Sequence, residues 1–213
     1  MPDFVGFGIL IVVVGSAAIG SGRRILERVR ARRALREKPV LAASSPEGTW
    51  VRVTGVVRVA DETLVAPLSG VTCVVFRARI TAGRNLARRA VRPREQLVMV
   101  PFVLDRGAEG TVAIEGRHVL LDVPRRNLRK LDRARGNQFA LAQGVSLKDA
   151  ARAIYEETVV EPGAMVSVAG LMMKDPATEP APVSTELGFR EAPPPALRLA
   201  GNADHPLVIG VNP

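Results

Sequence analysis

Residues 96–123 read QLVMVPFVLDRGAEGTVAIEGRHVLLDV, and this stretch indicates the fold class. Its apolar runs are short, and turn-forming residues interrupt them at 105–107 and again at 116–117. Short strands with a turn signal about every ten residues are typical of a small barrel or sandwich. Pro101 cannot donate a hydrogen bond to a neighbouring strand, so we expect a strand edge or a bulge there. The sequence therefore predicts a mainly β chain.

The strand pattern continues upstream in residues 50–60, WVRVTGVVRVA. Valines occupy alternate positions with arginine and threonine between them, which predicts a strand with one buried and one solvated face. Gly55 predicts a bulge or a close backbone approach within this strand. A linker at 40–48 separates the strand from the N-terminal part of the chain.

Residues 65–80 read VAPLSGVTCVVFRARI and combine a turn with a strand. Type I turns favour proline near the start and glycine at the end, and the predicted turn comprises Pro67, Leu68, Ser69 and Gly70. The strand at 71–80 contains Cys73, the single cysteine of the chain. A reactive thiol needs a nearby base or a helix terminus. The sequence offers neither close by, so we expect Cys73 to fill space in the core.

A short helix is predicted at 146–157, SLKDAARAIYEE, where Ser146 stands at the N-cap position. We expect this helix to pack on the sheet. Glu156 and Glu157 would then lie solvated at its C-terminal end.

The C-terminal part of the chain returns to a strand pattern. A strand is predicted at 161–175 and a final hairpin at 197–211, with its turn at 201–202. Between them, residues 176–195 contain six prolines, which predicts an extended connection.

Composition limits the chemistry that the chain can perform. The 213 residues are 47% apolar and 4% aromatic, so Val, Leu, Ile and Ala must fill the core. One Cys and two His exclude an intramolecular disulfide and a Cys/His zinc site of four ligands. We find no glycine-rich phosphate loop and no Ser-His-Asp arrangement, so we expect neither a cofactor nor catalysis. The formal net charge of +9 predicts an anionic neighbour, either lipid or nucleic acid.

Residues 4–22, FVGFGILIVVVGSAAIGSG, carry no charge and would extend about 28 Å as a helix, close to the thickness of a bilayer core. A dense basic segment follows them, and basic flanks stay on the cytoplasmic side of a membrane. We therefore predict a transmembrane anchor over residues 1–22 in the cell (inner) membrane. The N-terminus would lie outside and the C-terminal domain in the cytoplasm.

The same segment has two further interpretations. Small residues at 15–17 are compatible with a cleaved signal peptide, although nothing basic precedes the apolar run. The small-residue pairs Ser16/Gly20 and Ala18/Gly22 would let two such helices approach closely, which predicts a weak homodimer.

A basic juxtamembrane helix and linker are predicted over residues 23–48, and Pro39 ends the helical part. Each basic residue near an anionic inner leaflet adds about 1 kcal/mol of attraction; a simple orientation signal is the alternative. The predicted membrane-surface contacts are Arg23, Arg24, Arg28, Arg30, Arg32, Arg33, Arg36 and Lys38. Two further basic clusters, at 84–94 and 125–135, fit either solvated loops or contacts with phosphate-bearing surfaces.

Four motifs occur in order along the chain: GVV at 55–57, APLSGxxCVVFRA at 66–78, PFxLDxG at 101–107 and ExxVxPGxxVxVxG at 157–170. In this order, beside a predicted membrane span, they resemble the GIDE or "beside a membrane" (BAM) domain. That domain is known from mulan-type mitochondrial membrane ubiquitin ligases and from bacterial and archaeal membrane proteins. The resemblance covers about residues 50–211.

The resemblance implies a β-rich, membrane-adjacent interaction domain over residues 49–213, without catalytic residues. Ligases of the family also carry a second span and a RING finger. This sequence shows neither a second long apolar stretch nor a Cys/His ligand set, so ubiquitin transfer does not carry over. The expected fold is a small OB-like barrel or sandwich with one or two short helices, preceded by the transmembrane helix.

The leading functional hypothesis is a single-pass membrane protein whose cytoplasmic domain is an interaction or scaffold module for an unidentified membrane-associated protein. Its expected contact points are the turn at 67–70, the turn containing Asp105 and Gly107, and strand addition at the Pro101 edge. An OB-like nucleic-acid or anionic-lipid binding module is the alternative, although the aromatic residues follow apolar patterns that predict burial. An enzyme is a third class, in which Asp105 and Glu157 would form the acid pair.

Overall fold

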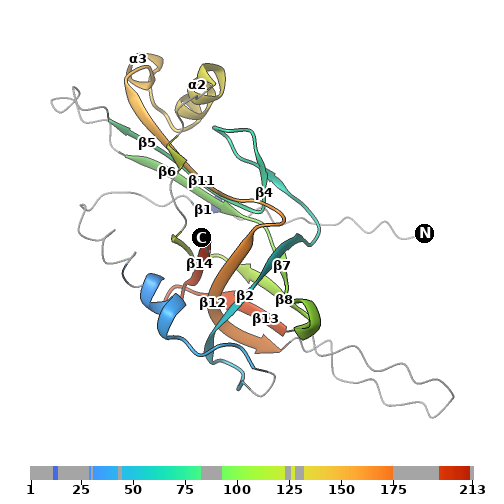
Figure 1. Cartoon of the computed structure of the whole chain (residues 1–213). Helices are drawn as coiled ribbons and strands as arrows, with labels where there is room; N and C mark the ends of the chain where they lie inside the picture. Colours follow the sequence, from blue (N-terminus) through green and yellow to red (C-terminus); the bar gives the residue numbers. More distant parts are fainter. Residues whose placement is uncertain are drawn as a thin grey trace, which may run out of the picture.

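A computed structural model of the chain describes residues 12–13, 29, 31–42, 45–82, 93–122, 126–127, 132–174 and 197–211. Within these residues the chain is mainly β, as predicted, with short helices at its surface (Figure 1). The strands form a five-stranded barrel that two further strands extend, a second sheet of five strands, and a two-stranded ladder.

The barrel closes because one long strand pairs on both of its sides. Its strands are β2 (Trp50–Val59), β7 (Phe102–Asp105), β8 (Thr111–Gly116), β12 (Met165–Lys174) and β13 (Leu197–Gly201). β12 pairs antiparallel with β2 and with β13, and β2-β7-β8-β13 complete the ring. Only the β8–β13 pair of this ring is parallel. Closure satisfies the backbone groups that an open sheet would leave at its edges.

The alternating valines of β2 build much of the barrel core. Val51, Val53 and Val57 are buried, whereas Thr54 is exposed, so the predicted face assignment is confirmed for these residues. The predicted close approach at Gly55 is also confirmed. A Cβ at Gly55 would lie 2.8 Å from the backbone carbonyl oxygen of Asp105 on β7.

The hairpin predicted at 197–211 is wrong. β13 and β14 (Leu207–Val211) each pair with β12, at 171–174 and 166–169 respectively, and their described residues do not pair with each other. β14 also pairs in parallel with β9 (Val119–Asp122), so β14 and β9 extend the barrel sheet. The local turn signal at 201–202 suggests a hairpin, but β12 is long enough to offer one continuous edge to both strands.

The second sheet, in the order β1-β6-β5-β11-β10, is built from two insertions into the barrel and from β1 (Val12–Val13) at its edge. One insertion, between β2 and β7, contributes β5 (Val75–Ala82) and β6 (Arg94–Met99). The other, between β8 and β12, contributes β10 (Arg126–Asn127) and β11 (Ala153–Val160). β5 pairs antiparallel with β11 along its whole length. Each insertion therefore needs the other to form this sheet.

The strand predicted at 71–80 is split at Val74 into β4 (Thr72–Cys73) and β5. Here the chain passes from the ladder that β3 (Leu64–Val65) forms with β4 into the second sheet. The N–H of Val74 donates to the carbonyl of Val160 over 2.9 Å, and the N–H of Val100 donates to the carbonyl of Val74 over 3.0 Å. Pro101 separates β6 from β7, so the predicted interruption of that strand is confirmed.

The helices differ from those predicted. Residues 147–150 form α3 (Leu147–Ala150), and the Ser146 hydroxyl accepts from the N–H of Asp149, as a helix cap should. The predicted continuation to 157 is wrong, because the β-branched run that follows pairs with β5 as β11. No helix was predicted at α2 (Arg133–Ala142), because its residues lack a clear apolar stripe. A short 3-10 helix, η2 (Gly107–Glu109), follows β7.

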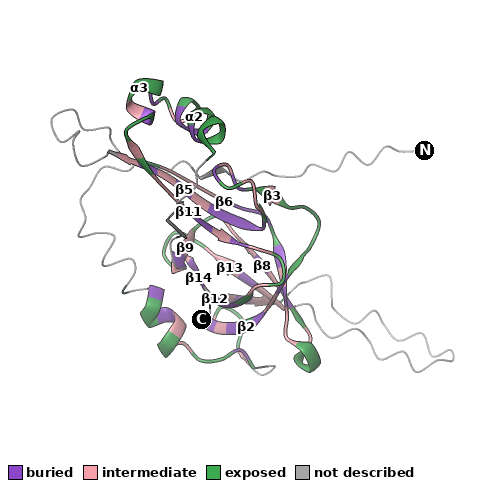
Figure 2. Ribbon diagram, turned by 45° about the horizontal axis from the view of Figure 1, so that its top comes forward, coloured by how far each residue is buried: buried purple, intermediate pink, exposed green. Residues whose placement is uncertain are grey.

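The described residues form two large apolar cores and a small third cluster beneath the basic helix. The barrel has one, and α2 and α3 cover a face of the second sheet to form the other, which includes Leu68, Cys73, Ile80 and Phe139. Figure 2 shows buried residues along the strands of both sheets and exposed residues on the outer sides of the helices.

The predicted membrane span lies outside the described residues, except for Val12 and Val13. These two form β1 and pair with Val98 and Leu97 at the edge of β6, so extended backbone stands where a helix was predicted. β-Branched valines favour extended backbone. The edge strand of a sheet also has unpaired backbone N–H and C=O groups, with which another extended segment can pair. None of the helices in the part of the chain that the structure describes is long and apolar enough to span a bilayer.

Candidate functional site: a cleft beneath the basic helix

The basic segment is helical over residues 31–37 and ends before Pro39, as predicted for this part of it. Its small side chains face the barrel: Ala31 and Ala34 are buried against Ala169 and Val208, and Leu35 packs beside them. The following residues, predicted to be a linker, are also held. Leu41 is buried in the barrel core, and its N–H donates to the carbonyl of Arg52 over 2.7 Å.

Polar contacts fasten the same helix to the barrel. The Nε of Arg32 lies 3.1 Å from a carboxylate oxygen of Asp122 on β9, and a guanidinium nitrogen of Arg52 donates to the carbonyl of Leu35 over 2.5 Å. Arg33 pairs with Glu37 over 2.6 Å, which raises the pKa of Arg33, and Arg36 is exposed. The other predicted contacts, Arg23, Arg24, Arg28 and Arg30, lie outside the described residues.

A cleft of about 720 Å³ opens between this helix and the barrel. Five parts of the chain line it: the basic helix, the start of β2, Leu97 on β6, the β8–β9 turn with β9, and the β13–β14 turn with β14. Its charged lining residues are Arg33, Lys38 and Arg117 on the basic side, and Glu37 and Asp204 on the acidic side. His118 and Trp50 are the remaining polar or aromatic groups that line it.

The two turns of the cleft are held together by a close backbone approach. The N–H of Leu207 donates to the carbonyl of His118 over 2.8 Å. A Cβ on Gly201 would lie 2.4 Å from the nitrogen of Leu207 and 2.8 Å from the oxygen of His118, so only glycine fits there. This contact places Arg117 and His118 beside residues 203–206.

Trp50 is the one tryptophan of the chain, and the side chains of Lys38 and His205 lie beside its ring. The Nζ of Lys38 lies 4.6 Å from the centre of its ring, a distance typical of a cation–π contact. The ring of His205 meets it edge-on, with centres 5.6 Å apart and planes at 83°. The buried indole Nε1 has no hydrogen-bond partner among the described residues.

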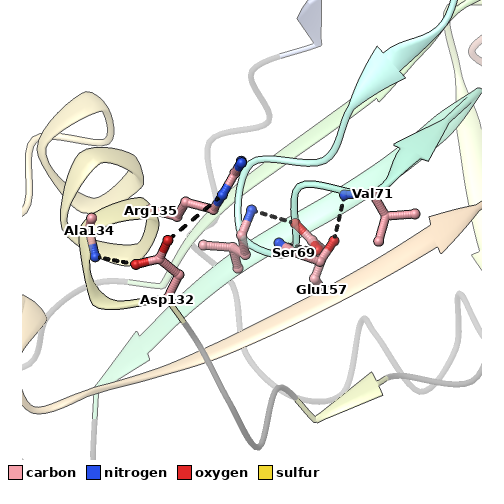
Figure 3. A network of polar contacts seen from close by, with 7 residues as sticks. Ser69, Val71, Asp132, Ala134, Arg135 and Glu157 are labelled. Carbon is pink, nitrogen blue, oxygen red and sulfur yellow. Dashed lines mark hydrogen bonds and ion pairs between the residues drawn. The ribbon is translucent and has the colours of Figure 1, made fainter.

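The predicted interaction turn at 67–70 contributes Leu68 to the second core, and Figure 3 shows the polar contacts around the turn. Leu68 is only 1% exposed, Pro67 and Gly70 are half-buried, and Ser69 is exposed. The carboxylate of Glu157 on β11 holds the turn in place. The prediction that Glu157 is solvated is therefore wrong. Glu157 is 2% exposed, and its two carboxylate oxygens accept from the N–H groups of Leu68 and Ser69 over 2.8 and 2.9 Å.

The turn after β7 is organised by Asp105. One carboxylate oxygen accepts from the N–H of Gly107 over 2.9 Å, and the other pairs with Arg58 over 3.1 Å. These contacts, the backbone hydrogen bond first, lower the pKa of Asp105. Asp105 lies in the barrel and Glu157 in the second sheet, and none of their described partners is shared, so the structure does not bring them together as an acid pair.

Cys73 is fully buried in the second core, as predicted. Burial, and then the charges of Glu157 and Glu161, raise the pKa of its thiol to about 12. Among the described side chains, no group of three or more His, Cys, Asp or Glu could hold a metal ion.

One residue of the basic cluster at 125–135, the exposed Arg135, lies beside the turn. The guanidinium of Arg135 on α2 lies against Gly70, so close that a Cβ there would be 2.8 Å from its central carbon. Most of the cluster at 84–94 lies outside the described residues.

Comparison with known proteins gave no match among protein-family models, curated proteins or solved structures.

Sequence reasoning missed the cleft. Its lining residues come from five separate parts of the chain, and each looks ordinary in its own segment. One signal was available: the only tryptophan and both histidines of the chain lie at strand ends or turns, where side chains are accessible. Nothing in their spacing shows that these turns meet.

Proposed function

We propose that this chain is a membrane-anchored binding module whose barrel is held at the anionic inner face of the cell membrane. The observation that carries the proposal is the docking of the basic helix on the barrel. If residues 4–22 cross the bilayer, the helix that follows them is packed on the barrel and bonded to it instead of forming a loose tether.

A docked helix makes the orientation of the barrel depend on the orientation of the helix. Arg36 is exposed and so available to anionic headgroups, while Arg32 is engaged with Asp122 and Arg33 with Glu37. Attachment to the bilayer raises the effective concentration of the barrel toward other membrane-bound molecules. Binding a membrane-associated partner, with no chemistry of its own, is the role that this arrangement supports best.

The topology favours the finer assignment to an OB-type barrel. A five-stranded Greek-key barrel has this character, and here the last barrel strand, β13, returns to lie parallel to β8. The same assignment agrees with the resemblance to GIDE or BAM domains, and the turn at 67–70 and the turn at 105–107 remain the proposed protein contacts.

Nucleic-acid binding is the weaker candidate. OB-type barrels bind single strands by stacking bases on exposed aromatic side chains. Phe76, Phe102 and Phe139 are buried in the two cores and cannot serve as such platforms. Among the described aromatic residues, Trp50 and Tyr155 are half-buried, and they lie in different sheets.

Energy transfer to labelled lipids tests the proposed orientation. Cys73 is buried and its thiol pKa is raised, so a cysteine introduced at an exposed site can be labelled selectively. We suggest Val40→Cys, next to the basic helix, and Lys148→Cys on α3, which lies at the opposite end of the molecule (Figures 1 and 2). The full chain would be reconstituted in nanodiscs that contain phosphatidylglycerol and a headgroup-labelled lipid. We expect stronger transfer from position 40, and equal transfer from both positions would contradict the proposal.

A further inference from the structure

We infer that the cleft beneath the basic helix binds the phosphate group of an anionic lipid headgroup. This inference rests on the proposed function, because it takes the ligand from the membrane surface to which the helix is proposed to bind. It adds a defined site and a ligand class to what would otherwise be a general electrostatic attraction.

The size of the cleft fits a headgroup rather than a single ion. Ligand pockets in proteins have volumes of about 300–1,000 Å³, and this cleft has about 720 Å³. It is also built on rigid elements: a docked helix, strands of both sheets, and two turns that a backbone hydrogen bond joins. The site is therefore formed before any ligand arrives.

The charges of the lining favour an anion. Arg33 is already paired with Glu37. Lys38 and Arg117 form no ion pair with any described residue, and they reach the cleft from different elements, the end of the basic helix and the β8–β9 turn. Asp204 is the one remaining carboxylate of the lining. Two cations on separate walls, with His118 beside Arg117, can donate charge-assisted hydrogen bonds to different oxygens of one phosphate.

The rest of the lining suits the apolar part of a lipid better than water. Apolar wall residues include Ala34, Leu97, Leu120, Pro206 and Val208. A free phosphate would leave this surface exposed, whereas the first methylene groups of the lipid chains would cover it and gain hydrophobic stabilisation. The cleft thus combines a cationic region with an apolar wall, as a phosphate attached to a lipid requires.

The fluorescence of Trp50 gives a direct measure of occupancy, because the single tryptophan of the chain lines the cleft. The full chain in neutral detergent would be titrated with dioctanoyl phosphatidic acid, dioctanoyl phosphatidylcholine and inorganic phosphate. We expect a saturable emission change with phosphatidic acid, a weaker one with inorganic phosphate, and none with the zwitterionic phosphatidylcholine over the same range.

Variants separate the site from general basicity. Arg117→Gln and Lys38→Gln should each weaken phosphatidic acid binding by about tenfold to a hundredfold, since each removes a hydrogen bond to a charged group. Arg152→Gln and Lys148→Gln are matched controls, because both side chains are exposed on the opposite part of the molecule and do not line the cleft. These controls should leave the dissociation constant unchanged.

Every outcome decides the inference. No saturable change, or a change that all four variants leave equal, would overturn it. Equal affinity for inorganic phosphate and phosphatidic acid would retain phosphate recognition but overturn the lipid as its source. The energy-transfer experiment is independent: a barrel that binds phosphatidic acid but shows equal transfer from positions 40 and 148 would contradict the proposed function and keep the site.

Discussion

The carboxylate of Glu157 accepts a hydrogen bond from the backbone N–H of Leu68, 89 residues earlier in the chain, over 2.8 Å. Its second oxygen accepts from the next N–H, that of Ser69, over 2.9 Å. A strand of the second sheet therefore fixes a turn that precedes that sheet in the sequence. Because the carboxylate is buried, water cannot readily take its place as the acceptor for these two N–H groups if the side chain is removed.

We expect Glu157→Ala to destabilise the protein by roughly 2–5 kcal/mol, because it leaves two backbone donors without partners and opens a cavity. Glu157→Gln should lose less, about 1–3 kcal/mol, since one acceptor oxygen remains. Denaturant unfolding of the full chain in detergent, followed by circular dichroism, measures both. Glu156→Gln is the control on the other face of the strand, where the carboxylate is paired with Arg79 over 3.7 Å. A similar loss in the control would show that the turn contact is not special.

We expect the Cys73 thiol to resist alkylation in the native protein at about pH 8, although a free thiol with a pKa near 8.5 reacts there. Its raised pKa also affects stability. The unfolded chain loses the thiol proton above about pH 8.5 while the native chain retains it. The stabilisation is complete below that pH and is lost as the pH rises toward the native pKa of about 12.

A thiol-reactive chromophore, added with and without denaturant, checks the reactivity. Cys73→Ala serves as the blank, and it should remain folded with a cost of about 1 kcal/mol. Fast labelling of the native protein would mean that Cys73 is accessible.

We expect Gly201→Ala to disturb the cleft more than its small size suggests. The new Cβ would lie 2.4 Å from one backbone atom and 2.8 Å from another, and backbone atoms cannot swing aside as a flexible side chain can. Overpacking of this kind costs about 1–3 kcal/mol, and it should shift Trp50 emission by separating the two turns. Ala108→Ser, exposed in η2 and outside the lining of the cleft, is the control and should change neither stability nor emission. An unchanged spectrum in Gly201→Ala would contradict the proposed role of this contact.

We expect the acid stability of the chain to depend on Asp105. Its pKa is lowered in the native state by the Gly107 N–H and by Arg58, so the native state binds a proton less readily than the unfolded state. The resulting stabilisation is present above the unfolded pKa, about 3.9, and is lost as the pH falls through the lower native value. Asp105→Asn should therefore flatten the fall of the melting temperature below about pH 4. Asp61→Asn, at an exposed turn, should leave the acid limb as it is in the wild type.

Sequence reasoning succeeded where the signal is local. The alternation of β2, the interruption at Pro101, the cap at Ser146 and the end of the basic helix before Pro39 each depend on a few neighbouring residues. It failed where local preference competes with pairing. A helix cap at Ser146 precedes residues 153–160, whereas these residues themselves include several β-branched side chains. They form a strand because they pair with β5 along its whole length.

The sequence by itself determined a mainly β chain with a valine core, a buried Cys73 and a basic helix beside a predicted span, because side-chain periodicity and turn chemistry act over a few residues. Only the tertiary structure decided the closure of the barrel through β13 and β8, the burial of Glu157 beneath the turn at 67–70, and the cleft around Trp50. Each of these joins segments tens of residues apart, and the free energy that brings them together comes from shared burial and hydrogen bonding that no single segment contains.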